Sequence, residues 1–171
     1  MTGARLTAER HPAPNFEPGR DGERPRAIVL HTTDGKWEGT LAWFANPESG
    51  VSAHYLVGLD GRLVRLVDEA DTARHAGRVL RPTATLAQGM ADLNSVTIGI
   101  ELCDEGDPGG VARPHAQYLA AARLVADIAA RWEIPLDRDH VIGHNEVFAE
   151  KTCPGNLDVE RVVREARAFS R

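Results

Sequence analysis

The stretch AIVLH, residues 27–31, is a continuous apolar run that ends in a histidine. A run without alternating polar residues is typical of a β-strand that is buried on both faces of its sheet. Such a sheet needs helices packed on both sides, because each apolar face has to be covered. Residues 27–31 therefore predict an α/β fold, whose other elements are expected further along the chain.

Three other segments are predicted to be strands. Residues 53–67, AHYLVGLDGRLVRLV, are typical of a β-hairpin, because Leu-Asp-Gly-Arg at the centre favours a turn between two apolar arms. Residues 95–103, SVTIGIELC, and residues 140–144, HVIGH, are short apolar segments of strand length. Together with residues 27–31 they supply the strands of one sheet.

Helical periodicity or capping signals mark three further segments. Residues 113–133 have an apolar stripe at helical spacing, and Pro135 is expected to end that helix. Residues 39–46 predict a short helix capped near Thr40, and residues 158–169, which begin with an aspartate, predict an amphipathic helix. Because strands and helices interleave, the sequence predicts a single α/β domain with a central mixed β-sheet flanked by α-helices.

The regions outside these elements are rich in turn-forming or polar residues. Residues 1–26 contain much proline, glycine and charge, and predict an irregular N-terminal segment before one domain over residues 27–171. Residues 77–95 have no regular periodicity, so we expect a long surface loop, a common place for binding residues.

Composition and charge exclude several classes of partner. The 171-residue chain has a formal net charge of −5, whereas a nucleic-acid-binding domain would carry a basic patch. No apolar run approaches the length of a membrane span, and the N-terminus lacks the apolar core of a signal peptide. We therefore expect a protein that is made in the cytoplasm and binds neither nucleic acid nor membrane; we also expect it to be a monomer. Its two cysteines are too few for a disulfide framework.

Two histidines and one cysteine have the context of a metal site. His31 ends the first buried strand, at the edge where open sheets collect ligands, and His144 ends another strand-like run. Cys153 lies in the loop beyond and precedes Pro154, which restricts the backbone of the residue before it. Two histidines and one cysteine leave a fourth position open, as catalytic zinc sites do, and so predict bound Zn²⁺.

Other roles for these residues are also compatible with the sequence. A histidine at the end of a buried strand can be a hydrogen-bonded core residue, and a lone cysteine can be a small buried hydrophobe. His140 is not a candidate ligand, because on a strand it would stand roughly 13 Å from His144, at about 3.3 Å per residue. His54, on the predicted hairpin, is a further polar group that could face the site.

Five segments carry a family resemblance: IVLHTTDG, VSAHYLVGLDG, ARHAG, VTIGIEL and VIGHNEVFAEKTCPG, in this order within residues 25–170. Together they resemble the zinc-dependent N-acetylmuramoyl-L-alanine amidases, and the last segment, with its Lys-x-Cys-Pro, is the most specific. This family includes phage amidase lysozymes, cytoplasmic muropeptide-recycling amidases and the peptidoglycan recognition proteins. The resemblance implies an amidase catalytic domain over residues 27–171, with the fold of that family.

The resemblance also implies a metal site and two catalytic residues. The family's zinc ligands fall on His31, His144 and Cys153. The third ligand is cysteine in the phage and recognition-protein branches and aspartate in the recycling branch. The lysine that stabilises the oxyanion falls on Lys151, and the catalytic glutamate of the recycling branch falls on Glu101. Glu101 is a charged residue within an apolar strand, which is seldom without a partner or a function.

Two other motifs imply residues that contact the substrate and a catalytic tyrosine. The histidine of a Trp-His-Ala-Gly-like motif falls on His75, preceded here by an arginine, and we expect His75 and His54 to contact substrate. Phage enzymes have a catalytic tyrosine where this chain has Ala53. Tyr55 would face the same side of a regular strand, so both Glu101 and Tyr55 are catalytic candidates, with Glu101 the expected general base.

These roles imply hydrolysis of the amide bond between N-acetylmuramic acid and L-alanine of peptidoglycan stem peptides. We expect a wall-lytic, endolysin-like and hence bacteriolytic enzyme, which acts on the wall after release or export. Two alternatives stay open. One is a cytoplasmic amidase that recycles soluble anhydromuropeptides, and the other is a non-catalytic peptidoglycan-binding module, although such modules usually lose the cysteine ligand.

Overall fold

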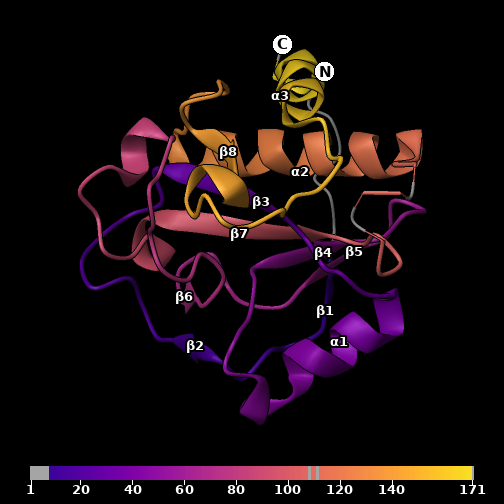
Figure 1. The fold of residues 1–171 in the computed structure, drawn as a ribbon, viewed down its shortest axis with the longest axis horizontal. Coiled ribbons are helices and arrows are strands. Elements are labelled where there is room, and N and C mark those ends of the chain that lie inside the picture. Colours follow the sequence, from indigo (N-terminus) through magenta and orange to yellow (C-terminus); the bar gives the residue numbers. More distant parts are fainter. Residues whose placement is uncertain (1–7, 108, 111, 171) are drawn as a thin grey trace.

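The computed structural model describes residues 8–107, 109–110 and 112–170. A six-stranded mixed sheet forms the centre of the domain, and helices lie on both of its faces (Figure 1). In spatial order the strands are β1 (Glu9–Arg10), β5 (Leu63–Arg65), β4 (Tyr55–Val57), β7 (Thr97–Leu102), β3 (Ala27–Thr32) and β8 (Val141–Gly143). The predicted α/β fold with a central mixed sheet is confirmed.

Strand β3 is the buried strand that the apolar run predicts. Residues 27–31 are all buried, and β3 pairs in parallel with β7 on one side and with β8 on the other. In the pairing of β3 with β7, His31 lies directly beside Glu101. Because parallel strands end at the same edge of a sheet, the carboxyl ends of β3, β7 and β8 lie together, where open sheets place their sites.

The predicted hairpin is present as β4 and β5. The two strands pair antiparallel, and β4 also pairs in parallel with β7, which makes the sheet mixed. The turn needs glycine at position 61, which has a φ of 86° and whose Cβ would lie 2.9 Å from the carbonyl oxygen of Ala116.

Two helices cover one face of the sheet, above it in Figure 1. They are α2 (His115–Trp132) and α3 (Val159–Phe169), and the side chain of Asp158 caps α3 by accepting from the backbone N–H of Arg161. Helix α2 ends before Pro135, because Glu133 already adopts a left-handed φ of 57°. The core beneath these helices contains buried residues of four strands: Ile28, Leu30, Tyr55, Val57, Ile98, Ile100, Leu102 and Val141.

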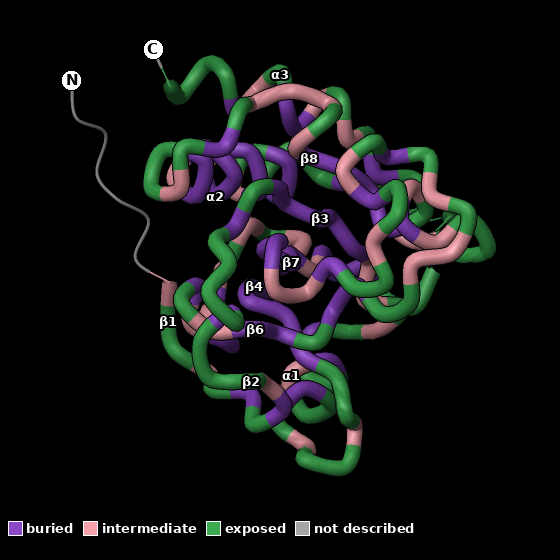
Figure 2. The backbone as a smooth tube through the Cα atoms, turned by 90° about the vertical axis from the view of Figure 1, so that its left-hand side faces the viewer, coloured by how far each residue is buried: buried purple, intermediate pink, exposed green. Residues whose placement is uncertain are grey.

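A helix and the loop before β7 cover the opposite face. Helix α1 (Trp37–Ala45) begins three residues before the predicted cap at Thr40, and Thr40 is buried within it. The predicted surface loop, residues 77–95, buries Leu93 in a cluster that also contains Val29 of β3. The loop has one short 3-10 turn, and a second begins at its end. Figure 2 shows the resulting core, with β3, β7 and β4 buried between exposed outer segments. Among the residues that the structure describes, no helix combines the length and apolarity needed to cross a membrane.

In the described part of the N-terminal segment, residues 8–26, two strands of two residues each interrupt an otherwise irregular chain. Strand β1 pairs in parallel with β5, and β2 (Phe16–Glu17) pairs antiparallel with β6 (Thr72–Ala73). Arg20 is 5% exposed and donates to backbone carbonyls around the start of β7, including that of Thr97. These contacts are with distant parts of the chain, so local composition does not reveal them. Residues 1–7 lie outside the described part.

Candidate functional site

The three predicted metal ligands meet at the carboxyl edge of the sheet. His31 is the fifth residue of β3, His144 begins the 3-10 turn η4 (His144–Glu146) directly after β8, and Cys153 lies in the following loop. The Nδ1 atoms of the two histidines are 3.1 Å apart, and Sγ of Cys153 lies 3.8 Å from Nδ1 of His31. One donor atom from each residue lies within 4.8 Å of the other two, so the arrangement is a possible metal site.

The environment of the two histidines suits neutral, metal-binding rings. Burial lowers the pKa of both His31 and His144, and the charge of Lys151 adds to the effect at each. Nε2 of His144 donates to the carbonyl oxygen of Ala76 at 3.0 Å, so the lone pair of the neutral ring is on Nδ1. That lone pair faces His31, and a cation between the two rings would use it.

Cys153 completes the donor set from the other side. The backbone N–H of Thr32 donates to Sγ of Cys153 at 3.2 Å. Burial, together with the charge of Glu101, raises the pKa of the Cys153 thiol to about 12. The thiol is therefore protonated at neutral pH without a cation, and metal binding there would release a proton.

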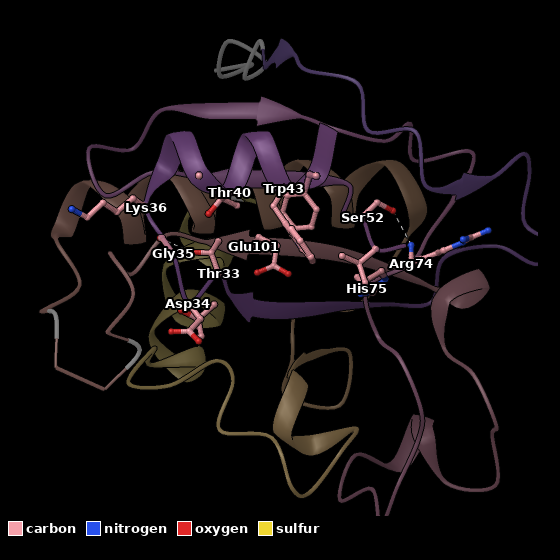
Figure 3. A pocket seen from close by; sticks show the side chains of 14 residues that line it. Thr33, Asp34, Gly35, Lys36, Thr40, Trp43, Ser52, Arg74, His75 and Glu101 are labelled. Carbon is pink, nitrogen blue, oxygen red and sulfur yellow. Dashed lines mark hydrogen bonds between the residues drawn. The ribbon is translucent and has the colours of Figure 1, made fainter. Parts of the chain in front are cut away.

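Glu101 has a carboxylate oxygen without a partner. Oε2 of Glu101 is buried and has no hydrogen bond to any part of the chain that the structure describes. Burial, with a smaller contribution from the charge of Asp104, raises the pKa of Glu101 to about 8. Figure 3 shows its carboxylate pointing into the cleft below Trp43. A carboxyl group with a pKa near neutrality is suited to accept and return a proton.

The cleft beside Glu101 lies between α1 and the ends of β3 and β7. Its volume is about 460 Å³. One wall is the segment after β3 together with α1, and the other is formed by residues 51–52 and 74–75, joined by a hydrogen bond from the backbone N–H of Arg74 to Ser52 (Figure 3). Trp43 on α1 lines this cleft and is 54% exposed. The cleft can therefore receive a ligand with both apolar and polar parts.

Lys151 borders the cluster of His31, His144 and Cys153. A smaller cavity of about 230 Å³ is lined by Lys151, Glu101 and the three candidate ligands, with Thr32, Asp34 and Thr152. The Lys151 side chain is at the surface, and its Nζ lies 5.8 Å from the ring centre of Phe148. A lysine at this position can bring a positive charge to a group bound in the cavity.

His75 lies behind His31 at the inner end of the cleft. It is 8% exposed, and its Nδ1 is 3.0 Å from Nε2 of His31. Its other ring nitrogen, Nε2, is 3.2 Å from the hydroxyl oxygen of Thr97. His75 also lines the cleft, so its predicted contact with substrate stays a prediction, but both ring nitrogens already have protein partners.

Tyr55 is not at the site, which contradicts its predicted catalytic role. The chain bends at His54 and β4 begins only at Tyr55, so the strand is not regular there. Ala53 packs in the cluster that contains Phe44 of α1, whereas Tyr55 packs in the cluster under α2. The Tyr55 hydroxyl donates to Oε1 of Glu69 at 2.6 Å, on the opposite face of the sheet from Glu101.

His54 is also wrongly predicted as a substrate contact. Its side chain is 0% exposed, and Nδ1 accepts from the backbone N–H of Gly99 at 3.0 Å. Nε2 lies 2.8 Å from Arg20, and burial together with that charge lowers the pKa of His54 to about 3. His54 is therefore a neutral core residue that no ligand in the cleft can reach.

Asp104 and Trp43 shape the site but were not identified from the sequence. Asp104 is fully buried and accepts from the backbone N–H groups of Asp34 and Gly35, at 3.1 and 3.0 Å, so it holds the turn after β3. A carboxylate just after a buried strand was the available signal for Asp104. For Trp43, the available signal was its spacing from Trp37. Six residues are not a whole number of helical turns, so the two rings lie on different sides of α1.

Comparison with known proteins gives one family and several relatives. The profile of a family described as N-acetylmuramoyl-L-alanine amidase matches residues 21–156. The chain is 32% identical over 123 residues to N-acetylmuramoyl-L-alanine amidase A of Achromobacter lyticus, a match that covers 71% of this chain and 60% of that protein. It is 31% identical over 169 residues to 1,6-anhydro-N-acetylmuramyl-L-alanine amidase AmpD of Salmonella typhimurium, over 88% of this chain and 84% of that protein.

The fold is also similar to a solved structure. A crystal structure of a selenomethionine derivative of AmpD superimposes with a TM-score of 0.75 and 28% identity, and the match covers 96% of this chain and 94% of that one. The agreement over nearly the whole of both chains includes the sheet that carries the cluster of His31, His144 and Cys153.

Proposed function

The chain belongs to the N-acetylmuramoyl-L-alanine amidase family, and from this membership we propose that it hydrolyses the amide bond between N-acetylmuramic acid and L-alanine of peptidoglycan stem peptides. The observation that carries the proposal is the buried carboxylate oxygen of Glu101, which has no partner among the described residues and lies next to the cluster of His31, His144 and Cys153. A proton acceptor beside a possible metal site is the arrangement that metal-assisted amide hydrolysis requires.

We propose Zn²⁺ as the ion held by His31, His144 and Cys153. Two imidazole nitrogens and one sulfur within 4.8 Å of one another are a donor set that zinc prefers, and three protein ligands leave a fourth position open. A bound zinc ion supplies a Lewis acid for the carbonyl oxygen and lowers the pKa of water.

The residues of the chain itself supply the proton transfer and further charge. Glu101 accepts a proton from the attacking water and returns it to the leaving amine of L-alanine, a role for which its raised pKa is suited. Lys151 stabilises the negative charge that develops on the carbonyl oxygen, because its side chain borders the same cavity. The cleft under Trp43 holds the part of the substrate next to the amide bond.

Two forms of the substrate are candidates. The first is polymeric wall peptidoglycan, supported by Cys153, since cysteine is the third ligand in the branches that the sequence resembles most in its last motif. The second is a soluble anhydromuropeptide, supported by similarity to AmpD of Salmonella typhimurium, whose name specifies a 1,6-anhydro-N-acetylmuramyl substrate. Both substrates contain the same amide bond, so the proposed chemistry is common to them.

Elemental analysis and an assay with both substrates test the proposal. We expect about one zinc per chain, loss of activity on chelation and recovery when zinc is added. Cys153→Ser should lose most of the bound zinc, because an alcohol does not ionise as a thiol does. Mass spectrometry of digested sacculi and of a soluble anhydromuropeptide then distinguishes the two substrates. Protein without a transition metal and with chelator-resistant activity would contradict the metal site.

We also propose that the chain acts as a monomer without nucleic acid or membrane. Size-exclusion chromatography with light scattering tests the oligomeric state, and a mass of twice 18.6 kDa would contradict it.

A further inference from the structure

Two residues shortly after β6, His75 and Ala76, contact the two candidate histidine ligands from behind. We propose that His75 is a positioning residue: with Thr97, it fixes His31 in the tautomer whose Nδ1 lone pair faces the metal, before any metal binds. The inference rests on the metal site proposed above, but it concerns the hydrogen bonds of the protein alone.

Leu93, Thr97, His75 and His31 form a series of hydrogen bonds. The carbonyl oxygen of Leu93 at the end of the series can only accept, and this fixes the direction of every other bond. The Thr97 hydroxyl donates to the carbonyl oxygen of Leu93 at 2.6 Å, and it has only one hydrogen. Its oxygen therefore accepts from Nε2–H of His75 at 3.2 Å, which leaves a lone pair on Nδ1 of His75. Nδ1 of His75 then accepts from Nε2–H of His31 at 3.0 Å, and the free lone pair of His31 is on Nδ1.

The neighbouring residue orients the second ligand in the same way. The carbonyl oxygen of Ala76 accepts from Nε2–H of His144 at 3.0 Å, which leaves Nδ1 of His144 free. The side-chain oxygen of Asn94 accepts from the backbone N–H groups of both His75 and Ala76, at 3.0 and 2.8 Å. One asparagine thus holds the two residues that set both tautomers, and the two Nδ1 atoms face each other 3.1 Å apart.

A glycine on β7 makes room for the His75 ring. A Cβ at position 99 would lie 2.3 Å from Cγ of His75, closer than any side-chain carbon can approach. The ring therefore lies directly on the backbone of β7, with its plane at 88° to the ring of His31 and 5.2 Å between the ring centres. This packing restricts the His75 ring to the orientation that its hydrogen bonds require.

Nitrogen NMR of the full-length protein labelled with ¹⁵N-histidine tests the tautomers directly. In the metal-free protein we expect hydrogen on Nε2, and none on Nδ1, for His31, His75 and His144. A hydrogen on Nδ1 of His31 would overturn the inference. This measurement needs no zinc, so it decides the inference even if the protein proves not to bind the metal, an outcome that would instead contradict the proposed function.

Substitution at position 97 tests the consequence for metal binding. Thr97→Val removes the acceptor of His75 at nearly constant volume, and we expect zinc affinity to fall about 10-fold or more, measured by competition with a chelating dye. Thr97→Ser keeps the hydroxyl and should restore affinity to within about 3-fold of the wild type, since the lost hydrogen bond is re-formed. Thr72→Val is the matched control, because the Thr72 hydroxyl also donates to a carbonyl oxygen, that of Gly19 at 2.8 Å, but it is not the hydroxyl that accepts from His75.

Two results for Thr97→Val lead to different conclusions. If folded Thr97→Val binds zinc as tightly as the wild type and its His31 signals are unchanged, His75 does not position His31 and the inference is wrong. If Thr97→Val does not fold, the tautomers in the wild-type protein decide the question alone.

Discussion

Two glutamates on opposite faces of the central sheet have opposite surroundings. Glu69, on the side covered by α2, accepts hydrogen bonds from Tyr55 at 2.6 Å, from Nε of Arg131 at 3.0 Å and from Trp132 at 2.6 Å. Glu101, on the side of the cleft, keeps a buried carboxylate oxygen without a partner in the described part of the chain. Glu69 is buried and Glu101 is half-buried, but only the carboxylate of Glu69 is surrounded by hydrogen-bond donors.

The pKa values of the two glutamates reflect this difference. Burial alone would raise the pKa of Glu69, but the hydrogen bonds from Arg131, Tyr55 and Trp132 together outweigh it and hold the pKa below its usual value. At Glu101 no group in the described part of the chain lowers the pKa against the effect of burial, and the charge of Asp104 raises it further. The comparison teaches that burial alone does not set the pKa of a carboxylate, and that the number of donors around it decides whether the pKa is raised or lowered.

Substitution of Glu101 should give the largest change in activity. We expect Glu101→Gln to lower turnover by about 10²-fold or more, because an amide cannot accept the proton from water. Bound zinc and the melting temperature should stay close to those of the wild type, since no hydrogen bond to the unpartnered oxygen is lost. Release of stem peptide, followed by mass spectrometry, measures turnover. Turnover within a few-fold of the wild type would remove Glu101 from the mechanism.

Substitution of Glu69 should have the opposite profile. Glu69→Gln removes the charge that Arg131 pairs with, and hydrogen bonds to a charged group are worth about 2 kcal/mol, so we expect a loss of that order in the free energy of unfolding. Urea unfolding measures the loss. Activity per folded molecule should not change, because Glu69 lies on the other side of the sheet; a large loss of turnover in fully folded Glu69→Gln would break the distinction between the two faces.

The contribution of Glu69 to stability should depend on pH. Because the pKa of Glu69 is lowered in the folded state, ionised Glu69 stabilises the fold fully above its pKa in the unfolded chain, about 4.3. This stabilisation is lost as the pH falls through the lower pKa of the folded state. The difference in unfolding free energy between the wild type and Glu69→Gln should therefore be full at pH 7 and shrink below about pH 4. A difference that stays constant from pH 7 to pH 3 would show that ionisation of Glu69 is not its source.

Substitution of Tyr55 should have the smallest effect. Tyr55→Phe removes one of the donors to Glu69 and keeps the ring in the core, so we expect a loss of about 1 kcal/mol in the free energy of unfolding. Turnover should stay unchanged, because the hydroxyl points away from the cleft. If Tyr55→Phe lowered turnover more than Glu101→Gln, the catalytic assignments of the two residues would have to be exchanged.

The sheet and the cluster of candidate ligands could be predicted because local sequence determines them. The apolar run at residues 27–31 can be covered only in the centre of a sheet, and β3 is such a strand. His31 and His144 each follow the apolar part of a strand-like run, so parallel pairing of these strands brings them to one edge. Cys153 follows closely enough in the chain to reach the same place.

Other features depend on contacts that no local pattern records. Tyr55 was misplaced because a single bend at His54 breaks the alternation of sides expected of a regular strand. The two-residue strand β1 has no periodicity of its own and exists only through pairing with β5. The contact of His75 with His31 depends on the absence of a side chain at Gly99, more than twenty residues further along.

The placement of the candidate ligands along the chain has a consequence for biosynthesis. His31 lies near the start of the described chain, whereas His144 and Cys153 lie more than a hundred residues later. At the usual rates of translation the ribosome needs on the order of 10 s to make the residues between them. During that time the nascent chain contains only one of the three donors. A three-coordinate site therefore cannot capture its metal until Cys153 has been made, so acquisition of the ion comes after most of the domain has been synthesised.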